Sequence, residues 1–235
     1  MVSKFIKERG MKIPKVQLAL DFEVLEEALA LSKQVAPFVD ILEAGTPLIK
    51  AEGVKAIRAL KDEYPDKLVC ADLKTADAGY LEVKMAAQAK ADIVSILADA
   101  YDITIQEALH AAYDFKVEIM ADLIVSRSPV IRLASLIDLK YKNKKLDYAL
   151  VHSGLDRQSS RRTPLLELQS VARLREHPKL AVAGGIRLSD ISKLADFPLE
   201  IIIIGGGITR SEDPQNTAKK IRKEINKYFS DKNFS

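Results

Sequence analysis

Two carboxylates and an ammonium group cluster in the segment 72–77, close enough in sequence to pair with each other or to bind a metal ion. The segment contains Asp72, Lys74 and Asp77, and it directly follows the apolar run 68–71, which indicates a buried strand. Because side chains alternate along a strand, Asp72 and Lys74 are expected to lie on the same side. Charges beside a core are costly unless they are paired or bound to a metal. We therefore predict a polar site at the end of this strand, built for ion pairing or metal binding.

The hydrophobic pattern of the whole chain indicates the elements that position these charges. Short runs rich in Val, Ile and Leu are typical of strands covered on both faces. Eight such runs occur, at 16–20, 38–42, 68–71, 93–97, 117–124, 148–151, 180–183 and 201–204. Amphipathic helical patterns lie between them, at 24–35, 54–60, 81–89, 105–112, 130–137 and 165–174, with a short helix at 190–194 and a last one beginning near 214.

This regular alternation predicts one α/β domain, a closed parallel (β/α)₈ TIM barrel. The chain has 235 residues, close to the length of about 250 that is typical of such barrels. An open doubly wound sheet is the structural alternative. We assign the barrel to residues 13–229, an N-terminal extension to 1–12 and a C-terminal tail to 230–235.

The carboxyl ends of the predicted strands carry ionisable side chains or glycines at nearly every position. Active sites of these barrels lie at that end, so we predict that the residues there line one site. In chain order they are Asp21, Glu43, Asp72 with Lys74 and Asp77, Asp122, His152, Gly184 and Gly185, and Gly205, Gly206 and Gly207.

Glu43 and Asp72 follow neighbouring strands and form a candidate metal site. Two carboxylates with few other ligands suit a hard cation such as Mg²⁺, which keeps several waters. No histidine pair or cysteine set supports zinc. The alternative is that both carboxylates pair with Lys74 and bind no metal. His152 lies at the end of the sixth strand, and its position is compatible with either a structural or a catalytic role.

Glycine clusters end the last two predicted strands. Glycines there let backbone N–H groups approach an anion, and this is the usual phosphate position of such barrels. Arg187 or Arg210 could add charge. The alternative is that the glycines make tight turns that need a positive φ. The predicted phosphate-binding residues are Gly184, Gly185, Gly205 and Gly206.

Composition argues against several classes of protein. The formal net charge is only +3, and no aromatic-rich basic stripe is present, so we expect no nucleic-acid partner. Cys70 stands alone, which excludes an intramolecular disulfide and a cysteine zinc cluster, and its place in a strand indicates a structural role. No run approaches the ~20 apolar residues of a membrane span. The N-terminus lacks the apolar region of a signal peptide, so we expect a cytoplasmic protein without a membrane partner.

Six motifs together resemble those of the 3-hexulose-6-phosphate synthases, a family within the orotidine-monophosphate decarboxylase superfamily. The resemblance runs from about residue 16 to 225. The motifs are Leu-Ala-Leu-Asp (18–21), Glu-Ala-Gly-Thr-Pro-Leu-Ile-Lys (43–50), Ala-Asp-Leu-Lys-Thr-Ala-Asp-Ala (71–78), Val-His-Ser-Gly-Leu-Asp (151–156), Ala-Val-Ala-Gly-Gly-Ile (181–186) and Ile-Gly-Gly-Gly-Ile (204–208).

Two positions favour the synthases over their nearest relatives, the 3-keto-L-gulonate-6-phosphate decarboxylases. Those decarboxylases tend to carry an arginine three residues after the histidine and another beside the last-strand glycine. Leu155 and Gly206 stand at these positions here. Arg161 and Arg162 replace a stretch that usually holds a glycine, which leaves the exact sugar phosphate open. A non-catalytic sugar-phosphate-binding subunit is the alternative of another class.

The resemblance implies an aldehyde-lyase that uses Mg²⁺, with Mn²⁺ as a substitute. Ribulose 5-phosphate would lose a C1 proton, and the enediolate would attack formaldehyde to give 3-hexulose 6-phosphate; the reverse cleavage is the same chemistry. By the resemblance, Glu43 and Asp72 hold the metal. Lys74 lies near the enediolate and is oriented by Asp21 and Asp72, and His152 transfers the proton.

The resemblance also implies a homodimer with shared active sites. Asp77 would reach the site of the neighbouring subunit, and the glycines after the last two strands would hold the 5-phosphate.

Overall fold

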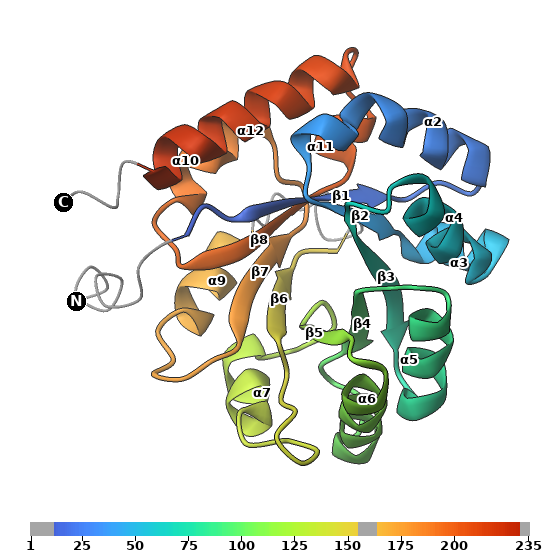
Figure 1. Cartoon of the computed structure of the whole chain (residues 1–235). Helices are drawn as coiled ribbons and strands as arrows, with labels where there is room; N and C mark the ends of the chain where they lie inside the picture. Colours follow the sequence, from blue (N-terminus) through green and yellow to red (C-terminus); the bar gives the residue numbers. More distant parts are fainter. Residues whose placement is uncertain (1–11, 155–163, 231–235) are drawn as a thin grey trace.

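Eight parallel strands pair in chain order, and β1 pairs with β8 to close a barrel (Figure 1). The computed structural model describes residues 12–154 and 164–230. The closure confirms the predicted (β/α)₈ barrel and excludes the open sheet. The strands are β1 (Lys15–Leu20), β2 (Ile41–Ala44), β3 (Leu68–Thr75), β4 (Ile93–Leu97), β5 (Glu118–Asp122), β6 (Tyr148–His152), β7 (Lys179–Ala183) and β8 (Leu199–Ile204).

Helices surround the barrel (Figure 1). In α12 the buried residues Ala218, Ile221, Ile225 and Phe229 recur every three or four positions, the spacing of one helix face. The helices are α2 (Leu25–Val35), α3 (Thr46–Glu52), α4 (Lys55–Glu63), α5 (Gly79–Gln88), α6 (Asp102–Phe115), α7 (Pro129–Leu136), α9 (Leu165–Val171), α10 (Ile191–Leu194), α11 (Gly206–Thr209) and α12 (Pro214–Ser230), with 3₁₀ turns at Ala36–Phe38 and Leu188–Asp190.

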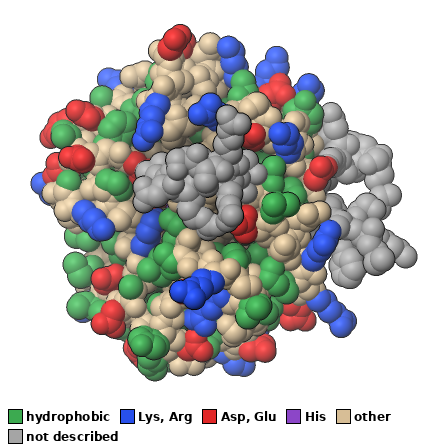
Figure 2. All heavy atoms as spheres, turned by 180° about the vertical axis from the view of Figure 1, so that it is seen from behind, with side chains coloured by type: hydrophobic (Ala, Val, Ile, Leu, Met, Phe, Trp, Pro, Cys, Tyr) green, Lys and Arg blue, Asp and Glu red, His purple; other side chains and the backbone are tan. Residues whose placement is uncertain are grey.

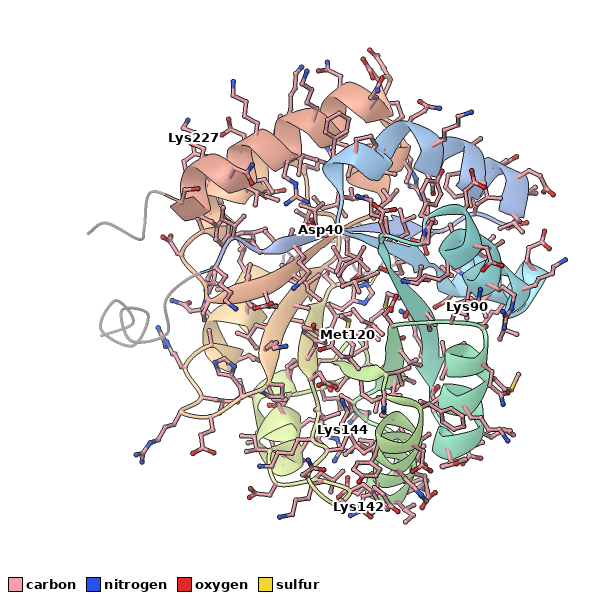
Figure 3. The ribbon with its side chains drawn as sticks, in the orientation of Figure 1. Asp40, Lys90, Met120, Lys142, Lys144 and Lys227 are labelled. Carbon is pink, nitrogen blue, oxygen red and sulfur yellow. The ribbon has the colours of Figure 1, made fainter. Side chains whose placement is uncertain are left out.

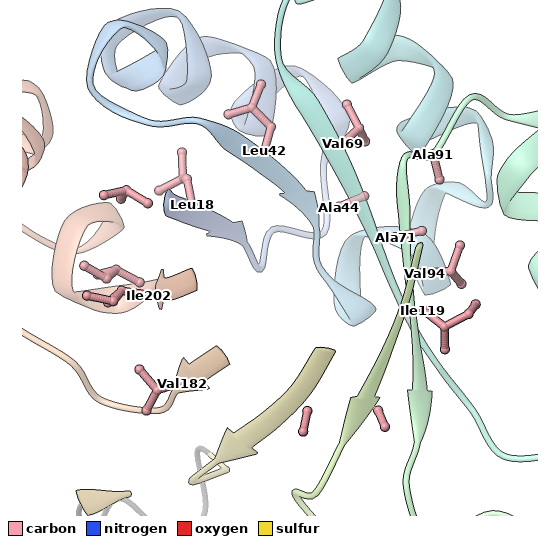
Figure 4. Packing of buried hydrophobic residues seen from close by; sticks show 14 of the residues in the cluster. Leu18, Leu42, Ala44, Val69, Ala71, Ala91, Val94, Ile119, Val182 and Ile202 are labelled. Atoms are coloured by element: carbon pink, nitrogen blue, oxygen red, sulfur yellow. The ribbon is translucent and has the colours of Figure 1, made fainter. Parts of the chain in front are cut away.

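Side-chain alternation divides the apolar residues into two layers. One set points outward from the strands and packs under the helices, as Leu18, Val69 and Ile202 do (Figure 4). The other set fills the inside of the barrel, where Met120 lies among side chains from the other strands (Figure 3). Cys70 belongs to this inner set and is buried and free, in agreement with its predicted structural role. Polar residues can therefore reach the barrel interior only from the strand positions whose side chains point inward.

Element boundaries differ from the predictions in ways that bear on the site. The second strand was predicted at 38–42 but spans 41–44, because Pro37 lies in a 3₁₀ turn that occupies 36–38. β3 continues through Thr75. Glu43 and Asp72 therefore lie within strands, and not after them. The short helices α3 and α11 were not predicted, since their Gly-Thr-Pro and Gly-Gly sequences indicate turns.

The outer surface carries charges of both signs. Lys and Arg side chains are interspersed with Asp and Glu on the face seen in Figure 2. Among the described residues, none of the helices combines the length and the apolar character needed to cross a bilayer.

Candidate active site

Asp72 lies on the inward face of β3, where its carboxylate accepts several hydrogen bonds. The ammonium of Lys74 lies 2.8 Å from Oδ1 and 2.6 Å from Oδ2. Ser95 Oγ donates to Oδ1 and Thr46 Oγ1 donates to Oδ2, each at 2.7 Å. Burial alone would raise the pKa of Asp72, but Lys74 and the two hydroxyl donors lower it overall. Asp72 is therefore a carboxylate at neutral pH.

Lys74 reaches Asp72 from an irregular backbone. Its φ is 49°, a left-handed conformation that is uncommon outside glycine, and the pairing of β3 with β4 shifts register here. Its N–H donates to Ser95 Oγ at 3.0 Å, and its Nζ lies 3.2 Å from Asp122 Oδ2. Burial alone would lower the pKa of Lys74, but the two carboxylates raise it above its ordinary value. Lys74 is a fixed positive charge.

Asp122, at the end of β5, connects Lys74 to His152. The Asp122 carboxylate is fully buried, and its Oδ2 also lies 3.0 Å from His152 Nδ1. Its Oδ1 accepts the N–H of Ile124 at 2.9 Å. With a proton on Nδ1 for this hydrogen bond, Nε2 is the ring nitrogen that can accept a proton. A chain of hydrogen bonds thus runs from Asp72 through Lys74 and Asp122 to His152.

Glu43 is a second buried carboxylate, on the inward face of β2. Its Oε2 accepts a hydrogen bond from Gln17 Nε2 at 2.6 Å. Burial and the charge of Asp72 raise the pKa of Glu43 well above its ordinary value, and the hydrogen bond from Gln17 acts in the opposite direction. The negative charges of Asp72 and Glu43 repel each other, and a cation between them would relieve this repulsion. Carboxylate oxygens are also the ligands that a hard divalent cation prefers.

The donor set at Glu43 and Asp72 fits Mg²⁺ in its chemistry. No group of three or more His, Cys, Asp or Glu side chains among residues 12–154 and 164–230 is arranged to hold a metal. A cation here would therefore have two protein carboxylates and would take its other ligands from water or a substrate, which is how Mg²⁺ is usually bound.

Asp21 lies at the mouth of the barrel, just after β1. Its carboxylate rests on the neighbouring strand ends: a Cβ on Gly45 would come within 2.3 Å of Oδ1, and one on Gly205 would lie 3.6 Å from Oδ2. Burial of the carboxyl group and, to a smaller extent, the negative charge of Asp72 raise the pKa of Asp21. Lys74 donates to Asp122 and not to Asp21, so Asp21 acts on Lys74 through its charge alone.

The glycines after β7 form a turn. Gly184 and Gly185 have φ values of 107° and 65°, which glycine adopts without strain. A Cβ on Gly184 would lie 2.2 Å from Ser153 O, and one on Gly207 would lie 2.3 Å from Ile186 O. The two glycine segments therefore pack closely on their neighbours. The tight-turn interpretation holds for Gly184 and Gly185, and it is compatible with the predicted phosphate site.

The glycines after β8 lead directly into α11. Gly206 is exposed, and a Cβ there would lie 3.6 Å from Cδ and Nε of Arg210. Arg210 also acts on Asp21, whose pKa its charge lowers as a minor contribution. A guanidinium therefore lies beside the backbone that was predicted to bind phosphate.

Asp77 does not contact the other residues of the candidate site. It is exposed in the loop between β3 and α5, and it makes no hydrogen bond or ion pair with any described residue. Its predicted role across a subunit interface stays a prediction. Leu155, Arg161 and Arg162 lie outside the described residues.

Three of the described side chains join the site although the sequence did not assign them to it. A fourth, Asp122, was predicted to line the site as a strand-end residue but was given no chemical role. Ser95 and Gln17 are polar residues inside apolar strand runs, two positions from the inward-facing Ile93 and Ala19, so alternation could have found them. Thr46 had no such signal, because it depends on helix α3.

A parallel barrel with an acid–base network at the carboxyl end of its strands is the arrangement of a TIM-barrel enzyme. A family model described as "Orotidine 5'-phosphate decarboxylase / HUMPS family" matches residues 14–221. The chain belongs to this family.

The chain is similar both to 3-hexulose-6-phosphate synthases and to a 3-keto-L-gulonate-6-phosphate decarboxylase. It is 38% identical over 213 residues to the 3-hexulose-6-phosphate synthase of Mycobacterium gastri, covering 90% of this chain and 99% of that protein. The structure of 3-hexulose-6-phosphate synthase from Salmonella typhimurium matches with a TM-score of 0.86 and 34% identity, over 91% of this chain and 99% of the other. The structure of 3-keto-L-gulonate-6-phosphate decarboxylase from Vibrio cholerae matches with a TM-score of 0.73 and 27% identity, over 92% and 98%.

Proposed function

We propose that this chain joins ribulose 5-phosphate and formaldehyde to give 3-hexulose 6-phosphate, and catalyses the reverse cleavage. The observation that carries the proposal is the hydrogen-bonded chain from Asp72 through Lys74 and Asp122 to His152. This chain supports the proposal because it connects a positively charged side chain, Lys74, to an imidazole, His152, that is proposed to accept a proton. The similarity to 3-hexulose-6-phosphate synthases supports the choice of substrates.

His152 is the proposed group for proton transfer. Its Nδ1 is tied to Asp122, so Nε2 takes the proton from C1 of ribulose 5-phosphate, and the buried carboxylate stabilises the imidazolium that forms. The electron pair left by the C1–H bond then forms the new bond to the formaldehyde carbon, and the formaldehyde oxygen takes up a proton. Lys74 supplies positive charge where the enediolate develops negative charge.

Glu43 and Asp72 are the proposed ligands of Mg²⁺, with Mn²⁺ as a substitute. When bound, the cation supplies Lewis-acid stabilisation of negative charge on the substrate oxygens. The raised pKa of Glu43 supports this assignment, because a carboxylate that is costly to ionise gains most from a neighbouring cation. The contacts of Lys74, Ser95 and Thr46 hold Asp72 in one orientation.

The glycine segments after β7 and β8 are proposed to bind the 5-phosphate. The turn at Gly184 and Gly185 and the segment at Gly205 and Gly206 present backbone at the barrel mouth, and Arg210 lies beside it. Binding energy from the phosphate, which does not react, orients the distant C1 end.

We also propose a homodimer in which Asp77 reaches the partner's site. Large apolar side chains are exposed on one side of the barrel, on or next to α5, α6 and α7. Tyr101 is 83% exposed and Ile131 is 72% exposed. Arg132, next to Ile131 on α7, donates hydrogen bonds to the carbonyls of Ala98 and Ala100, in the loop that precedes α6. The other members of this apolar surface are Leu81, Met85 and Ile103.

The second candidate is the decarboxylation of 3-keto-L-gulonate 6-phosphate, favoured by the similarity to the decarboxylase of Vibrio cholerae. Gly206 argues against it, since the decarboxylases tend to carry arginine there. A non-catalytic sugar-phosphate-binding subunit would account for the glycines and would leave the charge chain around Lys74 without a role.

The test is formaldehyde consumption with ribulose 5-phosphate, measured with Mg²⁺ and with EDTA. Loss of formaldehyde that EDTA abolishes, together with loss of C1 proton exchange in His152→Ala, is the expected result. Unchanged proton exchange in that variant would remove His152 from the mechanism. CO₂ release from 3-keto-L-gulonate 6-phosphate in place of formaldehyde loss would establish the decarboxylase, and a folded chain that does neither would favour the binding subunit.

A further inference from the structure

Gln17 is a buried amide inside the barrel, below the candidate site. It lies on β1 two residues before Ala19, which faces the barrel interior and pairs in register with Glu43 on β2. Gln17 therefore lies one inward position nearer the amino ends of the strands than Glu43 does. The side chain is 0% exposed, so none of its polar atoms is hydrated from the surface.

The hydrogen bonding of this amide points to Glu43. Gln17 Nε2 donates to Glu43 Oε2 at 2.6 Å, so the amide N–H holds this oxygen of Glu43. Gln17 Oε1 has no hydrogen-bond partner among the described residues. Buried amides normally satisfy both ends, and an apolar side chain of the same size would avoid this unpaired oxygen. Packing does not account for a glutamine here, whereas the contact with Glu43 does.

We propose that Gln17 is a positioning residue for the metal site. Its N–H fixes one oxygen of the Glu43 carboxylate and leaves the other, Oε1, to bind the cation. This inference rests on the proposed function, in which Glu43 and Asp72 hold Mg²⁺. Hydrogen bonds from outside the ligand shell orient metal ligands, and their removal typically lowers metal affinity about 10–100-fold.

Asp72 has the corresponding support from its own neighbours. Ser95 and Thr46 donate to its two oxygens, so its orientation is fixed independently of Gln17. Loss of Gln17 therefore frees one of the two ligands and leaves the other in place. We expect weaker metal binding and not the loss of the site.

The test is Mg²⁺ titration by calorimetry of the full chain, stripped with EDTA and dialysed, for wild type, Gln17→Leu and Gln17→Met. Both variants are expected to bind Mg²⁺ about tenfold more weakly or worse. Their activation constant for Mg²⁺ should rise by the same factor. A merely structural glutamine would change the melting temperature and leave both metal constants unchanged.

Tyr148→Phe is the matched control. It removes a hydrogen bond of 2.9 Å to a carboxylate, that of Glu118, inside the same barrel but at the amino ends of β5 and β6. Its Mg²⁺ affinity is expected to equal that of wild type. A loss of affinity shared by this control would overturn the specific role of Gln17.

Wild-type affinity in a folded Gln17 variant would also overturn the inference, and Gln17→Met decides this if Gln17→Leu does not fold. A wild-type chain that binds no Mg²⁺ would overturn the metal site and the inference together. The formaldehyde assay separates this outcome, because it reports the proposed reaction directly.

Discussion

The carboxyl groups of the site differ because their surroundings differ. Asp72 is held ionised by Lys74 and two hydroxyl donors, and its pKa is lowered. Glu43 lies close enough to feel the charge of Asp72 and is fully enclosed, and its pKa is raised. Environments that push the pKa values of neighbouring acids apart are typical of catalytic sites.

Replacement of Glu43 by Gln should make the stability of the metal-free chain less dependent on pH. Because the pKa of Glu43 is raised in the folded state, its contribution to stability is fully present below its ordinary pKa and is lost as the pH rises through the folded-state pKa. Glu43→Gln should therefore melt higher than wild type at pH 8 in EDTA, by about 2–4 °C for each kcal/mol removed. The gap should close toward pH 5.

Thermal melts of both proteins from pH 5 to pH 8 in EDTA measure this gap. Glu63→Gln, at an exposed position, is the control and should show no such trend. A gap for Glu43→Gln that stays constant with pH would contradict the raised pKa.

The loop after β3 is fixed at both of its ends. Lys74 and Ala78 both have left-handed backbone, with φ of 49° and 53°, and Asp77 lies between them. Helix α5 then begins at Gly79, where the chain approaches α6 so closely that a Cβ would come within 2.1 Å of Thr104 O. The contact between two helices thus fixes the far end of a loop whose near end is in the site.

Gly79→Ala should push α5 away from α6 and destabilise the barrel. Overpacking of this kind typically costs about 1–3 kcal/mol, and the clash is with backbone atoms, which cannot rotate away. Thermal unfolding should show a lower melting temperature. Gln88→Ala, at an exposed position on the same helix, is the control and should melt as wild type does. Equal melting temperatures for the two variants would contradict the close packing seen at Gly79.

The exposed apolar side chains on or next to α5, α6 and α7 include Leu81, which lies four residues after Asp77. A two-fold symmetric dimer uses the same surface on both subunits. It would bury side chains such as Tyr101 and Ile103, which are 83% and 62% exposed, and would bring each Asp77 toward the other subunit.

Mixing two inactive variants tests whether the sites are shared. Asp77→Ala lacks the contributed residue and Lys74→Ala lacks the resident one, so a mixed dimer has one intact site. Random exchange of equal amounts should restore about a quarter of wild-type activity, because half of the dimers are mixed. Formaldehyde consumption measures the rescue. Absence of rescue after exchange is verified by native mass spectrometry would exclude a shared site.

The amino-acid sequence was enough to predict the barrel and to nominate most of the polar residues at its mouth. The eight apolar runs and the helical patterns between them reflect local periodicity, which depends on near neighbours along the chain. Alternation within β3 was enough to place Asp72 and Lys74 on the same side, and the structure confirms their ion pair at 2.6 Å. The strand ends were found because parallel strands must align their carboxyl ends.

The contacts among these residues could not be predicted without the folded barrel. Lys74 and Asp122 are 48 positions apart, and their contact depends on barrel closure and on a left-handed turn at Lys74 that no local pattern indicates. The same holds for the hydrogen bond between Gln17 and Glu43, on different strands. Contacts of this kind depend on the register between strands and on the reach of each side chain, and these are properties of the folded barrel and not of any segment alone.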